Sequence, residues 1–144
     1  KRQISMRNST VFDCSVITLP KNHQLNGNLT SVNNGIEVPF DIKRVYYLYD
    51  VPGGFSRGGH GHKDLQQLIV ALSGSFDLIV DDGNVKRTIH LSRPNMGVYM
   101  PSGLWRELDN FSSGSICFVL ASHEYDEEDY FRNYENFVEW KSTK

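Results

Sequence analysis

The sequence contains no long hydrophobic run, no excess of basic residues and little cysteine. The formal net charge of the 144-residue chain is −2, so it lacks the clustered positive charge of nucleic-acid-binding proteins, and we expect no nucleic-acid partner. No apolar stretch approaches the ~20 residues of a membrane-spanning helix, and the polar N-terminal segment does not have the pattern of a secretory signal peptide. We therefore expect no membrane association.

The two cysteines, Cys14 and Cys117, lie far apart and do not have the spacing of a metal site. Free cysteine is commonly buried, and reduced thiols are typical of proteins in the cytoplasm. We predict two reduced, packed thiols and a cytoplasmic location.

Apolar residues are nevertheless frequent enough to form a hydrophobic core. They make up 39% of the chain, and aromatic residues make up 12%. The length fits one domain. We predict a flexible N-terminal arm or linker remnant over residues 1–10 and a single domain over residues 11–144.

Short segments rich in β-branched and aromatic residues predict strands, and Gly, Pro and Asp-Gly turns separate them. The glycine-rich segment 51–61 is predicted to be a loop. The tail over residues 127–140 has aromatic residues at helical spacing, which predicts a short helix packed on the rest. The predicted strands cover 11–19, a short piece of 21–35, 42–49, 66–71, 75–80, 85–91, 98–100, 106–108 and 116–121. This pattern indicates an all-β sandwich or barrel.

A pair of histidines gives the clearest indication of chemistry. His60 and His62 are two residues apart, so on an extended segment both side chains point to the same face. Imidazole has a reference pKa of about 6.5 and exchanges protons near neutrality. Gly54 precedes the pair by five residues, and Gln67 and Gly74 follow it. This spacing resembles the first motif of the cupins, in which a glutamate stands at the position of Gln67.

The second cupin motif is also matched, by Pro101, Gly103 and Asn110, with Arg106 at the position of its histidine. Metal-binding cupins hold their ion with three histidines and one glutamate. Here a neutral amide and a permanently charged guanidinium, which has no lone pair for a metal, replace two of these ligands. We therefore predict no metal and no other cofactor.

Arginines near the histidine pair are candidates for binding an anionic substrate. Arg57 lies three residues before His60, and Arg44 lies on the preceding predicted strand. Guanidinium groups and backbone N–H groups of a glycine-rich segment are suited to a diphosphate. Tyr46 could add a hydroxyl group. A solvated surface position is the alternative interpretation for both arginines.

The sequence resembles the cupin-type sugar 3,4-ketoisomerases, a WxcM-like family, over residues 24–137. The resemblance is carried by Pro39-Phe40, Lys43–Tyr47, Arg57–Lys63, Ser73–Ser75, Asp81–Gly83, Leu108–Ser112, Leu120–Ser122 and Tyr125–Tyr130. It implies a jelly-roll homodimer with exchanged strands that converts dTDP-4-keto-6-deoxyglucose to a 3-keto isomer without metal. It also implies a place in deoxyaminosugar biosynthesis for lipopolysaccharide O-antigens or S-layer glycans. Family members are sometimes fused to an acyltransferase domain, and the start at Lys1 is compatible with a cut from such a fusion.

The resemblance also implies roles for individual residues. His60 and His62 would be catalytic. Our own hypothesis, which leaves the choice of base between the two histidines open, takes His62 to remove the C3 proton and His60 to move a proton between the two oxygens. Arg44 and Arg57 would bind the nucleotide diphosphate, and Arg132 would add a further substrate contact. The enediolate intermediate would be stabilised by Arg106 or Tyr46, and Gln67 would also lie at the substrate. An arginine common near the start of family members is replaced here by Asn26.

Three other functions fit parts of the pattern. A metal-dependent cupin oxygenase would have to tolerate Gln67 and Arg106 beside its ion. A non-catalytic nucleotide-sugar-binding cupin would need the arginines but not two histidines on one face. A nucleotide-sugar epimerase would also remove a proton next to a keto group.

Overall fold

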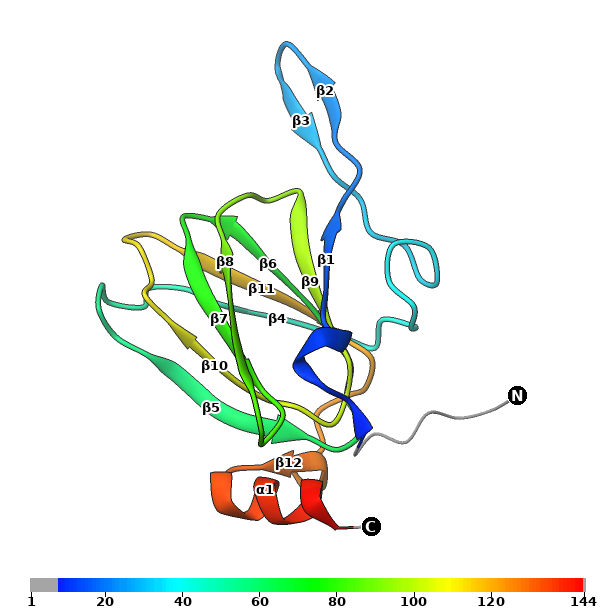
Figure 1. Cartoon of the computed structure of the whole chain (residues 1–144). Coiled ribbons are helices and arrows are strands. Elements are labelled where there is room, and N and C mark those ends of the chain that lie inside the picture. Colours follow the sequence, from blue (N-terminus) through cyan, green and yellow to red (C-terminus); the bar gives the residue numbers. More distant parts are fainter. Residues whose placement is uncertain (1–7, 144) are drawn as a thin grey trace.

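The computed structural model describes residues 8–143, and most of its strands belong to two antiparallel sheets that face each other (Figure 1). Within these residues no helix is both long enough and apolar enough to cross a membrane. The elements are η2 (Val11–Asp13), β1 (Ser15–Thr18), β2 (Asn22–Gln24), β3 (Gly27–Leu29), β4 (Arg44–Leu48), β5 (Arg57–His62), β6 (Gln67–Ser73), β7 (Phe76–Asp81), β8 (Lys86–Leu91), β9 (Met96–Met100), β10 (Trp105–Asp109), β11 (Ile116–Ala121), η3 (Glu127–Asp129), β12 (Tyr130–Phe131) and α1 (Tyr134–Ser142).

The first sheet has the order β1-β9-β6-β11-β4, and the second has the order β12-β5-β10-β7-β8. Strands β2 and β3 form a separate hairpin that projects from the body of the molecule (Figure 1). This arrangement confirms the predicted all-β, cupin-type sandwich with a short C-terminal helix.

The main core lies between the two sheets. The alternating residues Leu78 and Val80 of β7 are fully buried, as are Ile69 of β6 and Val119 of β11. Period-two alternation directs these side chains to the inner face. Cys117 is part of this core and Cys14 is also buried; both are free, as predicted.

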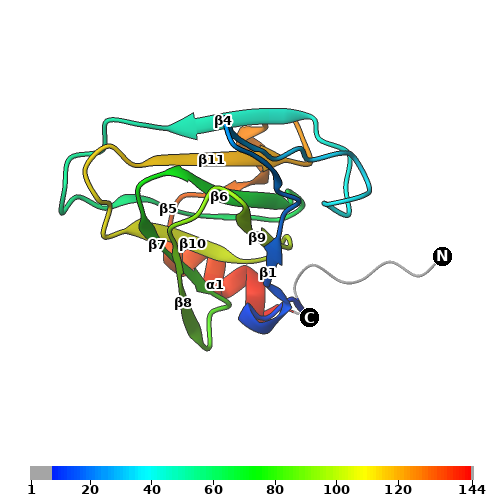
Figure 2. The ribbon, with the colours of Figure 1, turned by 90° about the horizontal axis from the view of Figure 1, so that it is seen from above.

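The C-terminal helix covers the outer face of the second sheet (Figure 2). Its Phe137 is fully buried and packs against Trp105 of β10 and Phe131 of β12. Asn133 caps the helix by accepting a hydrogen bond from the backbone N–H of Asn136. The predicted packing role of the tail is confirmed.

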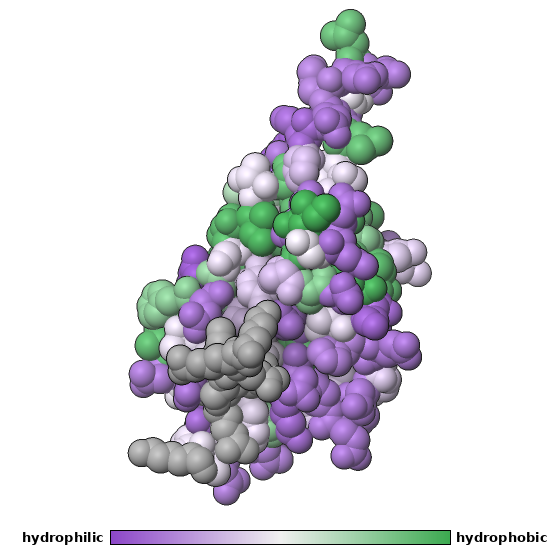
Figure 3. Space-filling model, turned by 90° about the vertical axis from the view of Figure 1, so that its right-hand side faces the viewer, coloured by the Kyte–Doolittle hydropathy of each residue, from purple (hydrophilic) through white to green (hydrophobic). Residues whose placement is uncertain are grey.

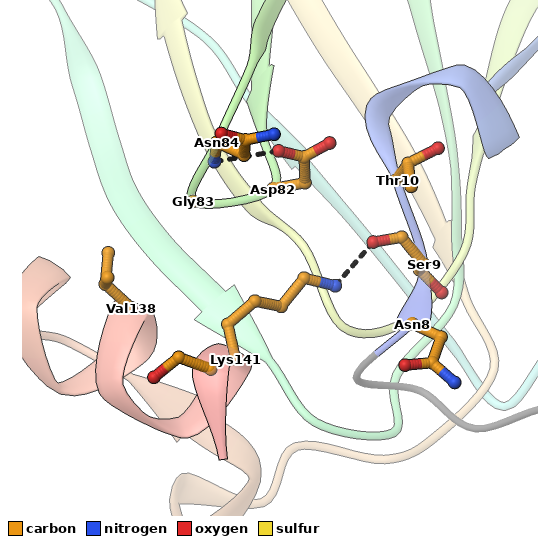
Figure 4. Close-up of a pocket in the computed structure, with 9 residues that line it drawn as sticks. Asn8, Ser9, Thr10, Asp82, Gly83, Asn84, Val138 and Lys141 are labelled. Atoms are coloured by element: carbon orange, nitrogen blue, oxygen red, sulfur yellow. Dashed lines mark hydrogen bonds between the residues drawn. The ribbon is translucent and has the colours of Figure 1, made fainter. Parts of the chain in front are cut away.

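The helix also connects the two ends of the described chain. Lys141 donates a hydrogen bond to the backbone carbonyl of Ser9, close to the turn at Asp82 (Figure 4). Asp82 accepts hydrogen bonds from three backbone N–H groups, and Arg87 donates to two backbone carbonyls of the N-terminal segment. We call this group, Ser9, Asp82, Arg87 and Lys141, the terminal junction. Residues 1–7 of the predicted arm lie outside the described residues, whereas Ser9 is already buried.

The prediction of one continuous strand over residues 11–19 was wrong. Thr10 and Asp13 form a capping box, in which the Asp13 carboxylate accepts a hydrogen bond from the Thr10 N–H at 2.8 Å. This local bonding stabilises the short helix η2, so the strand β1 begins only at Ser15.

The prediction of a loop over residues 51–61 was wrong in its second half. From Arg57 onward the chain is strand β5, which pairs with β10. Two glycines in this strand are required by packing and not by a turn. A Cβ atom at Gly59 would lie 2.9 Å from a ring carbon of Trp105, and one at Gly61 would lie 3.0 Å from Phe137.

Candidate active site

A cavity of about 170 Å³ lies at one end of the sandwich, where β4 of the first sheet meets β5, β10 and β12 of the second. Six of the eight site residues predicted from the sequence line it. They are Arg44, Tyr46, Arg57, His60, Arg106 and Arg132, and Leu48, Gly58, Leu108 and Tyr130 complete the wall. The remaining two, His62 and Gln67, are each 1% exposed and lie behind residues of this wall.

The two histidines are brought together as their spacing predicted. Both lie on β5, and their ring centroids are 5.0 Å apart with the rings nearly perpendicular. His60 is the register partner of Arg106 on β10. The His60 imidazole is therefore part of the cavity wall, and the His62 imidazole lies behind it and in contact with it.

Burial keeps both rings neutral. Burial, and then the positive charge of Arg106, lowers the pKa of His60 to about 2. Burial also lowers the pKa of His62, although the nearby carboxylate of Asp129 partly opposes this shift. A neutral imidazole has one nitrogen with a free lone pair, so both rings are in the form that a general base needs.

Arg106 is a charged side chain that is only 2% exposed. Its Nη2 donates a hydrogen bond of 2.8 Å to the Tyr46 hydroxyl. Within residues 8–143, its Nε and Nη1 have no hydrogen-bond partner, and no carboxylate forms an ion pair with it. A buried cation in this state is costly unless an anion or other acceptor offsets it. The cavity is therefore suited to an anionic group.

Tyr46 connects Arg106 to Gln67. Its hydroxyl accepts from Arg106 and donates to Oε1 of Gln67 at 3.4 Å. Gln67 is thus linked to the cavity wall through Tyr46, and its amide oxygen orients that hydroxyl.

Three further arginines surround the cavity. The guanidinium carbon of Arg44 lies 4.6 Å from the centroid of the Tyr46 ring, and Arg44 donates to the Tyr130 hydroxyl at 3.3 Å. Arg132 lies over the Tyr130 ring at 4.3 Å and pairs with Glu127 at 2.8 Å. Arg57 lies at the exposed start of β5. Together with Arg106 these groups give the cavity a positive charge, which favours a diphosphate.

Two residues at the histidines had no role in the sequence-based prediction. Strand β12 pairs with β5 and places Tyr130 opposite His62, with their ring centroids 4.3 Å apart. Oδ2 of Asp129 lies 3.4 Å from Nδ1 of His62. Both residues belong to the acidic and aromatic block 125–130, which the sequence analysis used for the family resemblance alone.

The donor set does not fit a metal ion of the cupin type. Gln67 and Arg106 occupy the positions at which a metal cupin has its glutamate and third histidine. Arg106 and His60 both line the cavity, and a guanidinium has no lone pair to offer a metal. In the described part of the chain, no group of three or more His, Cys, Asp or Glu side chains is placed to hold a metal.

Comparison with known proteins gives consistent matches. The family model described as "FdtA: WxcM-like, C-terminal" matches residues 12–142. A TDP-4-oxo-6-deoxy-α-D-glucose-3,4-oxoisomerase of Aneurinibacillus thermoaerophilus is 43% identical over 125 residues, which are 87% of this chain and 90% of that protein.

Two solved structures are similar over nearly the whole chain. The WlaRB TDP-quinovose 3,4-ketoisomerase of Campylobacter jejuni has a TM-score of 0.86 and 43% identity, covering 90% of this chain and 99% of that one. QdtA, a sugar 3,4-ketoisomerase of Thermoanaerobacterium thermosaccharolyticum in complex with TDP, has a TM-score of 0.88 and 36% identity, with coverages of 92% and 96%.

Proposed function

The chain belongs to the WxcM-like, C-terminal (FdtA) family, and we propose that it converts a dTDP-4-keto-6-deoxyhexose to its 3-keto isomer by histidine acid–base catalysis without a metal. The relatives are named as 3,4-ketoisomerases of TDP-linked sugars, so the chain is an isomerase of this type. The observation that carries the mechanism is a pair of neutral imidazoles, half-buried His60 and buried His62, beside the Arg106 guanidinium, two of whose nitrogens have no partner within residues 8–143.

The C4 carbonyl acidifies the proton on C3, and a neutral imidazole removes it. We assign this step to His62, whose ring lies behind His60 and Tyr130 of the cavity wall. The assignment requires that the bound sugar opens this wall to Nε2 of His62. The electron pair of the C3–H bond moves into the C3–C4 bond, and the C4 carbonyl oxygen becomes an enediolate oxygen. His60 lines the cavity and transfers a proton from the C3 hydroxyl toward the C4 oxygen. The His62 imidazolium then delivers its proton to C4, which leaves a carbonyl at C3, a hydroxyl at C4 and a neutral His62 ring. Each proton-transfer group contributes about 10²–10⁴-fold to the rate.

The enediolate carries a negative charge that solvent would otherwise stabilise. Arg106 has two free N–H-bearing nitrogens at the cavity, Nε and Nη1, without a partner among residues 8–143. Fixed donors in a site with little water stabilise a developing oxyanion more strongly than water does. Tyr46 holds the guanidinium by accepting its hydrogen bond. It would act as a second donor to the enediolate by turning its hydroxyl hydrogen from Oε1 of Gln67 to the substrate.

The arginines at the mouth of the cavity would bind the diphosphate of the substrate. Arg44, Arg57 and Arg132 come from three separate segments, so together they could contact the charged group from several directions. The TDP bound to QdtA supports this assignment of the nucleotide. Neutral donors alone would not give the same preference for a dianion.

A second copy of the chain is the partner we propose, in a homodimer with exchanged strands. The hairpin β2–β3 projects from the body and exposes Leu25 at its turn and Leu29 on β3. Figure 3 shows apolar groups on the part of the molecule that projects. Edge strand β4 exposes Val45 and Tyr47. Apolar side chains on a projecting hairpin and an open sheet edge are typical of strand exchange. Light scattering should give a dimer mass, and a monomer mass at micromolar concentration would contradict the proposal.

The wider context is also a proposal. Residues 11–144 would form one catalytic domain, because the family match spans nearly the same range. A 3-keto sugar is the substrate that transamination needs, which supports deoxyaminosugar biosynthesis for lipopolysaccharide or S-layer glycans. The free thiols favour a cytoplasmic location. Fusion to an acyltransferase domain stays a prediction.

The experiment that tests the function treats the protein with a chelator, adds dTDP-4-keto-6-deoxyglucose in D₂O and follows the sugar by NMR. We expect a 3-keto product with deuterium incorporated at C4. His62→Asn should lose both product and exchange at C3, whereas His60→Asn should lose product and keep some exchange at C3. His90→Asn, at an exposed position on β8, is the control. Bound TDP without any conversion would identify a binding protein, and exchange at C5 an epimerase.

A further inference from the structure

The carboxylate of Asp129 is held in place independently of the histidine beside it. Its Oδ1 accepts a hydrogen bond from the backbone N–H of Asp64 at 2.7 Å, and its Oδ2 accepts one from that of Leu65 at 3.3 Å. The backbone carbonyl of Asp129 also accepts from the N–H of Lys63 at 3.1 Å. The turn that follows β5 therefore fixes both the residue and the direction of its side chain.

This fixed carboxylate faces one nitrogen of His62. Oδ2 lies 3.4 Å from Nδ1, and the two side chains are only 12% and 2% exposed. Among residues 8–143, no other carboxylate lies within ion-pair distance of His62. Contacts of this length at catalytic groups commonly tighten only when substrate binds.

The chemistry of the pair determines where the proton of the imidazole lies. The His62 ring is neutral because burial lowers its pKa, so only one of its nitrogens carries a hydrogen. A carboxylate only accepts hydrogen bonds, so it favours the ring form with the hydrogen on Nδ1. The lone pair is then on Nε2, on the opposite side of the ring from Asp129. Arg106 and Arg44 oppose protonation of this ring, whereas Asp129 favours it.

We propose that Asp129 is a positioning residue for His62. Its carboxylate holds the imidazole in the Nδ1–H form, and it stabilises the imidazolium that forms when Nε2 takes the C3 proton. The part of this inference that concerns the imidazolium formed during catalysis rests on the proposed function. Its statement about the ring form does not depend on turnover. The C-terminal segment that the sequence analysis treated as packing thus supplies a group that acts on the reaction through His62.

The test combines NMR of the ring nitrogens with kinetics of Asp129→Asn. In ¹⁵N-histidine-labelled wild-type protein, the His62 signals, assigned by their loss in His62→Asn, should show the Nδ1–H form. In Asp129→Asn the side-chain oxygen can keep its bond from Asp64. An amide NH₂ replaces Oδ2, loses the longer bond from Leu65 and faces Nδ1. That donor should convert His62 to the Nε2–H form, lower kcat on the order of 10²-fold and change KM by less than about threefold.

Glu128→Gln is the matched control, since it removes one negative charge from the adjacent, exposed residue. It should leave both the spectrum and kcat unchanged. A wild-type His62 in the Nε2–H form would overturn the inference, and so would an Asp129→Asn variant that keeps most of its kcat. Because the wild-type spectrum is itself a test, poor folding of the variant does not remove it. An Nδ1–H ring in a wild-type protein without isomerase activity would refute the proposed function and leave the ring form established.

Discussion

The cavity and the terminal junction both hold buried or half-buried charged side chains at the second sheet, but the two regions differ in how these charges are paired. At the junction, Asp82 accepts hydrogen bonds from the N–H groups of Val11, Asn84 and Val85. Burial by itself would raise the pKa of the Asp82 carboxyl group. The three backbone donors have the opposite and larger effect, so the net shift lowers its pKa. Arg87 donates to the carbonyls of Val11 and Cys14 at 3.1 and 3.0 Å.

In the cavity, the corresponding side chains are only partly paired: Arg106 and Arg44 each donate to one tyrosine hydroxyl, and other nitrogens stay without a partner in the described part of the chain. Within residues 8–143, two nitrogens of Arg106, Nε2 of His60 and one nitrogen of Arg44 are buried and make no hydrogen bond. A folded protein rarely leaves buried polar groups unpaired unless a ligand or a reaction uses them. The difference indicates that the hydrogen-bonded charges at the junction stabilise the fold, whereas the incompletely bonded charges in the cavity are available to bind substrate.

Arg106→Met tests most directly whether the cavity and the junction differ in this way, and it has the largest effect on kcat that we expect. Methionine removes the unpaired charge and keeps most of the buried volume. We expect kcat to fall about 10²–10³-fold, as for the loss of an oxyanion donor. The free energy of unfolding should stay the same or rise, because an uncompensated buried cation is removed. Turnover with dTDP-4-keto-6-deoxyglucose and urea unfolding measure the two quantities.

Arg87→Met is the matched variant at the junction and should give the reverse result. Two backbone carbonyls lose their donor, which costs about 2 kcal/mol in the free energy of unfolding. The kcat of the folded protein should not change. If instead Arg106→Met unfolds at a much lower urea concentration than wild type and Arg87→Met does not, the distinction between the two regions is wrong.

The sequence carries enough information for the fold and for part of the site. Period-two alternation in β7 and β8 and the turn at Asp82 predict a hairpin that the structure contains. The spacing of His60 and His62 predicts two rings on one face, and the rings are in contact. The positions of Gln67 and Arg106 relative to the cupin motifs also identify two groups that lie together at Tyr46. Patterns of local spacing are sufficient for all of these.

Groups that depend on long-range packing were not predictable in this way. Gly59 and Gly61 indicate a loop when read locally. Only the positions of Trp105 on β10 and of Phe137 on α1 explain why a strand has glycine there. The pairing of β12 with β5 brings together residues that are far apart in the chain. No local pattern in the acidic tail indicates that Asp129, and not one of its acidic neighbours, faces a histidine.

The smallest effect we predict concerns the dependence of stability on pH. The pKa of His60 is lowered from an ordinary value of 6.5 to about 2, first by burial and then by Arg106, His62, Arg132 and Arg44. Between these two values the unfolded chain binds a proton at this position and the folded chain does not. Stability from the neutral ring is therefore fully present above about pH 6.5 and is lost as the pH falls.

From pH 7 to pH 5 this loss amounts to at most about 2 kcal/mol for His60. Between pH 7 and pH 5, the free energy of unfolding should therefore fall less in His60→Asn than in wild type. Urea unfolding at both pH values measures this change. His90→Asn, which removes an exposed histidine that pairs with Asp77 at 2.7 Å, should not reduce it in the same way. Equal slopes in wild type and His60→Asn would mean that the cavity does not hold this ring neutral. The cavity would then resemble the junction, where every buried charge is compensated by a neighbour.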